Sequence, residues 1–277
     1  MEKSQDILGK SLKFIFLAII TVISLGPFLW VFLSSFKTNK EILSFSFGLP
    51  EVFSLKNYVN AFKLAPIARF FFNSIFVTFM GVVLNVMAVS MSAYMLSRFE
   101  FKGRVLIRTI FSMGLLMPGA ALLLPLYMSI KTIGLYNNVW GLVIVYAAFG
   151  IASSVFIMSS YFKTIPKEME ESAYLDGAGF IGTFVKIIIP LARPALATAG
   201  IMQFLLCWNE FQFSLVLTTG PESRTLPVAL YYFKSAFASD YGAMFAAITL
   251  VSLPSIITYI FMQKQVASGL TAGSVKG

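Results

Sequence analysis

The sequence contains no histidine and a single cysteine, and only 12% of its 277 residues are charged. The absence of histidine excludes histidine-ligated haem or zinc and removes the usual general base of a catalytic set. The single cysteine, Cys207, cannot form a disulfide within the chain. No G-x-x-x-x-G-K-[ST] loop is present to cradle a nucleotide phosphate. We therefore expect no catalytic residue, and no metal or cofactor bound by this chain itself.

Hydrophobic residues are abundant, at 58% of the chain, with a mean hydropathy of +0.83. A soluble domain has about a quarter of its residues charged, so the composition indicates an integral membrane protein. The net charge of +9 comes from basic residues in short segments between apolar runs. Membrane topology explains such a pattern better than nucleic-acid binding does. We expect a lipid bilayer as the surrounding medium and no nucleic-acid partner.

Long apolar runs predict six membrane-spanning helices, since about 20 apolar residues cross a bilayer as a helix. A basic start followed by an apolar run also describes a signal peptide, but no clear cleavage site follows the first run. We therefore predict an uncleaved first helix. Pro118 and Pro125 are expected to bend the third span, because proline removes a helical hydrogen bond. The predicted spans lie within residues 14–36, 70–97, 109–130, 132–162, 195–218 and 241–262.

Two long segments between the spans are predicted to lie outside the membrane. In residues 37–69, the positions of Leu55, Tyr58, Val59 and Phe62 predict a short surface helix. Residues 219–240, which contain TGPESRTLPVAL, are predicted to form a loop. Within the second span, polar side chains such as Asn73, Ser74 and Asn85 are expected to hydrogen-bond between helices.

The stretch 167–194 is the only long segment that carries several acids. Glu168, Glu170 and Glu171 follow Pro166, which is tolerated in a first helical turn, and acids are favoured there by the helix dipole. Glycines at 177, 179 and 182 then weaken the helix. The pattern predicts a short helix, a glycine break and a second helix. Met169, Ala173 and Gly177 recur every fourth residue, and such a face can lie flat against another protein.

The same stretch resembles the EAA loop of ABC importer permeases, in the form typical of carbohydrate importers. The resemblance rests on Glu171-Ser172-Ala173, Asp176-Gly177-Ala178, Ile188, Pro190 and Pro194, with Ser172 where the motif's name has alanine. It extends over nearly the whole chain and is strongest at 168–194, 208–211 and 269–277. It implies an all-α integral membrane fold, with the six transmembrane helices of a type I ABC importer permease and a cytoplasmic coupling helix. The implied parts are a cytoplasmic N-terminus (1–13), a permease domain (14–262, coupling loop 163–194) and a cytoplasmic tail (263–277).

The resemblance also implies roles for individual residues. The coupling helix docks on a separate ATPase, the tail contacts the same ATPase, and a loop near the sixth span faces a binding protein. The implied ATPase-coupling residues are Glu168, Glu171, Ser172, Ala173, Asp176, Gly177, Ala178 and Pro190. The implied tail contacts are Gly269, Leu270, Thr271 and Gly273, and the implied binding-protein-facing residues are Gly220, Pro221 and Arg224.

Glu210 is the only charged residue deep within a predicted span. An ionisable side chain in a membrane usually faces a bundle interior or water. The surrounding FLLCWNEFQFSL resembles the equivalent helix of sugar permeases, and amides and aromatic faces suit a sugar. Trp208, Asn209, Glu210 and Gln212 are therefore predicted to lie on the pore or substrate path.

The expected function is that of the permease subunit of an ATP-driven sugar importer, with an oligosaccharide as the first expectation; monosaccharide and glycerol-3-phosphate remain alternatives. The resemblance implies a second homologous permease, two ATPase subunits that bind ATP and Mg, and an extracytoplasmic sugar-binding protein. It also implies a bacterial cytoplasmic membrane. Thirteen of the 21 basic residues lie on one side if the termini are inside, which predicts cytoplasmic termini.

Two other classes of protein remain possible from the sequence. A self-contained secondary transporter or channel would predict internal repeats and several intramembrane charges. A membrane-embedded enzyme would need a cluster of acids, histidines or metal ligands at one depth. The sequence shows one deep charge, no convincing repeat and no such cluster.

Overall fold

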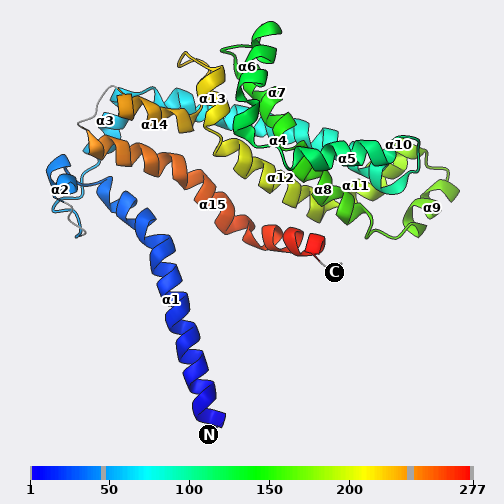
Figure 1. The fold of residues 1–277 in the computed structure, drawn as a ribbon, viewed down its shortest axis with the longest axis horizontal. Helices are drawn as coiled ribbons and strands as arrows, with labels where there is room; N and C mark the ends of the chain where they lie inside the picture. The colour runs from blue at the N-terminus through cyan, green and yellow to red at the C-terminus, as the bar shows by residue number, and fades with distance from the viewer. Residues whose placement is uncertain (1, 45–47, 236–239, 275–277) are drawn as a thin grey trace. The chain divides into compact units, whose positions relative to one another are not determined.

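The computed structural model describes residues 2–44, 48–235 and 240–274, and these residues form helices with no strand (Figure 1). The chain divides into two compact units. The first comprises residues 1–67 with 229–253, and the second comprises residues 68–228 with 254–277.

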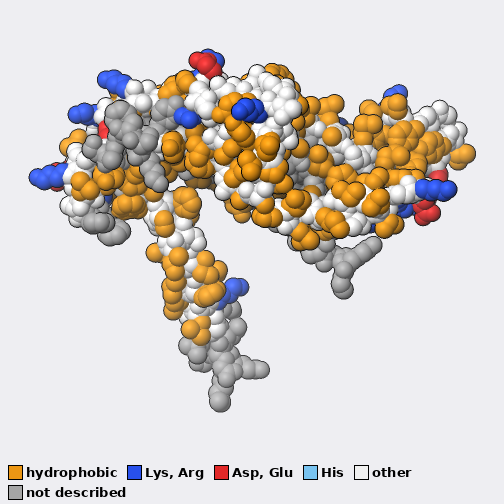
Figure 2. Space-filling view, turned by 45° about the horizontal axis from the view of Figure 1, so that its top comes forward, with side chains coloured by type: hydrophobic (Ala, Val, Ile, Leu, Met, Phe, Trp, Pro, Cys, Tyr) orange, Lys and Arg blue, Asp and Glu red, His pale blue; other side chains and the backbone are white. Residues whose placement is uncertain are grey.

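The first unit contains α1 (Glu2–Ser34), α2 (Asn39–Leu43), α3 (Lys56–Leu64), most of α14 (Leu226–Ser235) and the first part of α15 (Tyr241–Ser274). Many of the side chains that α1 exposes between residues 11 and 34 are apolar, as Figure 2 shows, and Phe14 and Val22 are examples. Such a surface suits the hydrocarbon of a bilayer. The helix predicted over 54–62 is confirmed as α3.

Hydrogen bonds close the segment between α1 and α3. The Tyr58 hydroxyl lies 2.8 Å from the Ser35 hydroxyl, and Asn57 donates to the Ser35 and Lys37 carbonyls. A capping box between Thr38 and Glu41 begins α2. Hydrogen bonds from the Glu51 amide and from Thr38 hold the pKa of the Glu41 carboxyl below its ordinary value.

The second unit begins with the long helix α4 and continues through shorter helices. The first group is α4 (Ile67–Arg98), α5 (Arg104–Gly114), η1 (Gly119–Leu122), α6 (Leu123–Thr132), α7 (Val139–Phe149) and α8 (Ile151–Phe162). The next group is α9 (Glu168–Leu175), α10 (Phe180–Thr183), the π-helix η2 (Phe184–Ile188), α11 (Ile189–Leu191), α12 (Arg193–Trp208) and α13 (Gln212–Leu217).

A further helix, α14 (Leu226–Ser235), occupies part of the segment predicted to be a loop. That prediction is wrong for Leu226–Ser235, which form a helix. Pro227 lies near the start of α14, where proline costs a helix little, so the cluster of turn residues before it marks a helix start rather than a continuing loop.

In the described part of the chain, three helices are long and apolar enough to cross a membrane, at Ser11–Ser34, Ile67–Arg98 and Tyr241–Phe261. Three bent helix pairs bring the number of candidate spans up to six. The bends are 104° between α5 and the η1–α6 segment, 44° between α7 and α8, and 76° between Phe180–Leu191 and α12. The sharpest bend includes Pro118, as predicted, whereas Pro125 lies in the first turn of α6 without breaking it.

The break between α7 and α8 frees backbone carbonyls, and polar side chains from other helices satisfy them. Gln203 on α12 donates to the Tyr146 carbonyl at 2.8 Å, and Asn85 on α4 donates to the Ala147 carbonyl at 2.8 Å. The Gln203 amide lies so close to Gly150 that a Cβ there would overlap it. Hydrogen bonding between helices by Asn85 is thereby confirmed.

The segments that join the helices of the second unit gather at the two ends of α4. Near its start, Asn73 donates to the Glu222 and Arg224 carbonyls. Asn137, in the turn after α6, accepts from the Thr219 and Gly220 amides. The segments after α4 and α8 meet instead at the other end of α4, through Arg98. Successive connecting segments therefore lie alternately at the two ends of α4, as expected for a chain that crosses a membrane repeatedly.

Candidate functional site: the α9 segment and the Glu210 break

The helix α9 begins and ends as its residues predict. Its first turn carries Glu168, Glu170 and Glu171 near the positive end of the helix dipole. Gly177 has φ +81°, a conformation that costs glycine little, and the Ala178 amide donates back to the Ala173 carbonyl at 2.9 Å. The predicted short helix and glycine break are confirmed.

The two faces of α9 differ in exposure. The outer face carries the exposed acids together with Leu175, whose side chain is 89% exposed and was not singled out from the sequence. Ala173 is buried, and Gly177 lies beyond the helix end, so Met169, Ala173 and Gly177 do not form one open face. The exposed residues among the predicted coupling set are Glu168, Glu171, Ser172, Asp176, Gly177 and Pro190, and Ala178 is half-buried.

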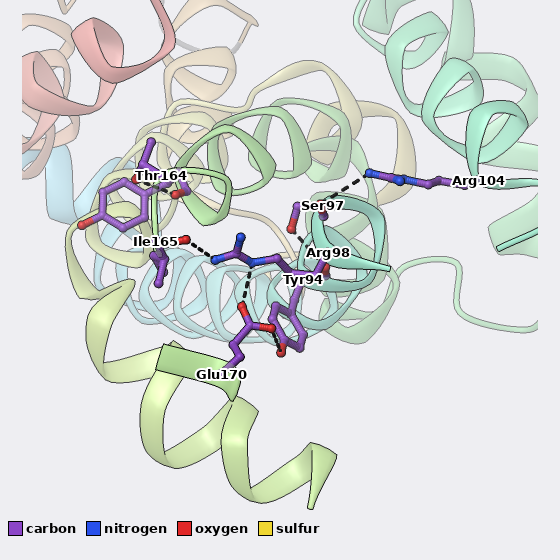
Figure 3. Close-up of polar contacts among 8 residues, drawn as sticks. Tyr94, Ser97, Arg98, Arg104, Thr164, Ile165 and Glu170 are labelled. Carbon is purple, nitrogen blue, oxygen red and sulfur yellow. Dashed lines mark hydrogen bonds and ion pairs between the residues drawn. The ribbon is translucent and has the colours of Figure 1, made fainter. Parts of the chain in front are cut away.

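The buried side of α9 is fixed to the end of α4 through Glu170 (Figure 3). The Glu170 carboxylate lies 2.7 Å from the Arg98 Nε, and the Tyr94 hydroxyl donates to it at 3.0 Å. Arg98 also donates to the Ile165 carbonyl, just before α9. The side chains of Arg98 and Glu170 are only 6% and 10% exposed. We call Tyr94, Arg98, Ile165 and Glu170 the Glu170 cluster.

Aromatic side chains surround this cluster. The Tyr94 ring lies with its centroid 5.1–5.8 Å from the rings of Phe99, Phe162, Phe180 and Phe184. These rings come from α8, α10, η2 and the segment after α4. The contact of α9 with α4 therefore lies beside an aromatic cluster to which α8 also contributes. The sequence did not indicate this cluster, because Arg98 and Glu170 lie 72 residues apart in the chain.

Glu210 lies at the break between α12 and α13, where it caps the second helix. Its Oε1 accepts from the Phe213 amide at 2.8 Å, and its Oε2 accepts from the Ser214 amide at 3.0 Å. The Tyr146 hydroxyl donates to the same Oε2 at 2.7 Å. The break frees amide groups that a membrane cannot satisfy, and this carboxylate satisfies two of them.

The other predicted pore residues have different surroundings. Trp208 is 2% exposed, with its ring stacked on Phe204 and edge-on to Phe71. Asn209 is exposed, donates to the Leu205 carbonyl and accepts from the Ser255 hydroxyl. Gln212 is exposed at the start of α13. The structure thus leaves Asn209 and Gln212 open to a ligand, and a role for all four in a substrate path stays a prediction.

The remaining predicted residues lie in a loop and in the tail. Gly220 and Pro221 lie in the loop that Asn137 holds, beside Arg224, whose carbonyl accepts from Asn73. The backbone of α15 continues to Ser274, so the predicted tail contacts lie on a helix, and their side chains are outside the described residues. These tail residues are Gly269, Leu270, Thr271 and Gly273.

Three comparisons with known proteins bear on this architecture. Residues 86–271 match the family model described as "Binding-protein-dependent transport system inner membrane component". The chain is 37% identical to a probable ABC transporter permease of Bacillus subtilis, YurM, over 98% of this chain and 90% of the relative. It is 35% identical to the trehalose/maltose transport system permease MalG of Thermococcus litoralis, over 99% of each chain.

A solved structure gives the same fold. A chain of a bacterial ABC transporter involved in the import of the acidic polysaccharide alginate aligns with a TM-score of 0.81 at 27% identity, over 94% of this chain and 97% of that chain. The diacetylchitobiose uptake permease NgcG of Streptomyces coelicolor is 36% identical, over 92% of this chain and 85% of the relative. With the exposed α9 fixed on α4 and the helices broken at polar side chains, these matches place the chain in the binding-protein-dependent transport system inner membrane component family, as the permease subunit of an ABC importer.

Proposed function

We propose that this chain forms half of the translocation pore of an ATP-driven sugar importer, and that its exposed α9 face docks on a separate ATPase subunit. The chain's relatives are named for diacetylchitobiose and for trehalose or maltose, and the similar solved structure imports alginate. These names support an oligosaccharide as the substrate. ATP and Mg belong to the ATPase, and a second permease completes the pore.

The observation that carries the proposal is the asymmetry of α9. Its outer face is acidic and carries one highly exposed leucine, Leu175. Its inner face is bound to α4 by the buried ion pair of Glu170 and Arg98. A displacement of α9 by a closing ATPase dimer would move the end of α4 with it. Because α4 has 32 residues and rises about 1.5 Å per residue, the movement would pass across the bilayer.

The proposed docking on an ATPase also implies which side of the membrane α9 faces. An ATPase requires α9, and hence the basic end of α4, to be in the cytoplasm. The loop that contains Gly220 and Pro221 then faces outward, where an extracytoplasmic sugar-binding protein delivers its ligand. One solved neighbour, at 15% identity, is a complex of the alginate transporter with a pentasaccharide-bound periplasmic protein.

The test is a pull-down of the tagged chain from native membranes, comparing Leu175→Asp with the matched control Leu175→Met. The side chain is exposed, so neither change should alter folding. Burying a leucine is worth about 1.5–3 kcal/mol, so Leu175→Asp should weaken ATPase recovery about 10-fold or more, while Leu175→Met retains it. Equal recovery of the ATPase with both variants would contradict docking through this face.

A self-contained carrier is the alternative. In that case the chain would emerge from native membranes alone and would move solute in liposomes without ATP. Recovery with a second permease and an ATPase, and sugar uptake that requires both, supports the importer instead.

A further inference from the structure

A cavity of 180 Å³ lies between α5 and α8, in the second unit, and has no part in the proposed coupling or in the Glu210 break. A single water needs about 10–15 Å³ of such space, so the cavity can hold a group much larger than one water molecule. It opens on the surface through exposed side chains such as Leu115 and Phe156.

One end of the cavity is cationic and rich in hydroxyl groups. Arg108 on α5 and Lys163 after α8 line it, with Ser159 and Ser160. In the described part of the chain no carboxylate pairs with the Arg108 guanidinium. The Ser159 Oγ is buried and has no hydrogen-bond partner within the described residues, which is costly unless something else bonds to it. Neither α5 nor α8 contains an acidic residue.

The other end of the cavity is apolar. The two helices run in opposite directions, because Arg108 and Lys163 share one end while a Cβ on Gly114 would lie 3.2 Å from the Ala152 Cβ at the other. Leu115, Ala152 and Val155 line this second end. A ligand that fills the whole cavity therefore has an anionic head with hydrogen-bond acceptors and an apolar chain.

We propose that the α5–α8 cavity binds an anionic phospholipid, with the phosphate oxygens on Arg108, Lys163 and the Ser159 hydroxyl, and an acyl chain along Leu115 and Ala152. A basic pocket between membrane helices suits such headgroups. With α9 in the cytoplasm, the cationic end lies at the cytoplasmic leaflet, where anionic lipids are found. Lys163 is five residues before Glu168, so the bound lipid would brace the segment that leads into α9.

The experiment measures binding of fluorescent phosphatidylglycerol and phosphatidylcholine to the purified importer complex in a non-ionic detergent. The variants are Arg108→Gln and Ser159→Ala, with Lys102→Gln as the matched control, because Lys102 is an exposed cation of the same basic segment that does not line the cavity. The wild-type complex should prefer phosphatidylglycerol. Arg108→Gln should weaken that binding about 5-fold or more, since each cation near an anionic surface contributes about 1 kcal/mol.

Ser159→Ala keeps the proposal testable if Arg108→Gln folds poorly. It removes only a buried hydroxyl without a partner, so thermal stability should be unchanged or higher while phosphatidylglycerol binding falls. Lys102→Gln should leave binding unchanged.

Three results would overturn the proposal. Equal binding of the two lipids, or equal losses in Lys102→Gln and Arg108→Gln, would reduce the effect to surface charge. Displacement of the lipid by inorganic phosphate at the same concentration as by unlabelled phosphatidylglycerol would indicate a free-anion site. Lipid binding by the isolated chain that disappears in the complex would assign the cavity to a neighbouring subunit.

Discussion

Glu170 carries a charge that is almost removed from water and is stabilised by two neighbours, Arg98 and Tyr94. Breaking a buried pair by removing one partner leaves an uncompensated charge, which costs about 3–5 kcal/mol. Replacing both partners with apolar residues of similar volume is often neutral for stability. A double variant that keeps stability therefore allows a role of the pair in coupling to be tested apart from its structural role.

We predict that Glu170→Gln lowers the free energy of unfolding by about 3 kcal/mol or more, and that the double change Arg98→Met with Glu170→Leu restores most of it. Thermal unfolding of the complex in detergent measures both.

If the pair transmits movement from α9 to α4, the double variant should fold and hydrolyse ATP with its partners but transport fewer sugar molecules per ATP. Tyr94→Phe provides the intermediate case, with the loss of one hydrogen bond to a carboxylate, about 1.5–3 kcal/mol.

An unchanged transport-to-hydrolysis ratio in the stable double variant would contradict a coupling role for the pair. The pair of Glu170 and Arg98 would then contribute to stability alone.

At the scale of the element, polar side chains satisfy backbone groups at two of the helix breaks. Gln203 and Asn85 satisfy the carbonyls freed between α7 and α8, and Glu210 satisfies the amides freed between α12 and α13. The deep acid is therefore explained by capping before any contact with substrate is invoked.

We predict that Glu210→Ala destabilises the membrane domain, because it leaves the Phe213 and Ser214 amides without an acceptor and costs about 1–3 kcal/mol for each group left unsatisfied. The matched control is Gln212→Ala, since the Gln212 side chain is exposed two residues away at the start of α13. Thermal unfolding should show a lower Tm for Glu210→Ala alone. Recovery of the ATPase should stay unchanged in both, because α9 is held at the other end of α4.

The opposite pattern would be an unchanged Tm for Glu210→Ala together with a raised KM for sugar uptake. That result would support the prediction from the sequence that Glu210 lies on the substrate path.

Much of this architecture follows from the sequence, and the exceptions have physical causes. An apolar run of membrane length predicts α4 closely, and the glycine after Asp176 predicts the end of α9. The burial of Glu170 could not be predicted, because its partner Arg98 lies 72 residues earlier. Nothing in the sequence distinguishes Glu170 from the two other acids in the same turn. The bend at Gly150 was missed for a similar reason, since it depends on Gln203 from another helix.

For the whole molecule, the remaining question is which side of the membrane each end of α4 faces. Basic residues favour the cytoplasm, by thirteen to eight, for the side on which the sequence predicts the termini and the coupling loop to lie. The two ends of α4 carry separate sets of loops, so one accessible position on each is sufficient to decide. Introduced cysteines can be labelled with little background reaction, because the single native cysteine, Cys207, is only 3% exposed.

We predict that Pro221→Cys reacts with a membrane-impermeant maleimide in intact cells, whereas Lys102→Cys reacts only after the membrane is permeabilised. Both positions are exposed, and they lie in segments at opposite ends of α4, so each reports one side. The unmodified chain should not react in either condition, which makes it the control. The reverse pattern would place α9 outside the cell, where no ATP-driven subunit could reach it. The coupling role of the Leu175 face would then be wrong even though the fold and the family stand, and the Glu170 cluster would have to be explained by folding alone.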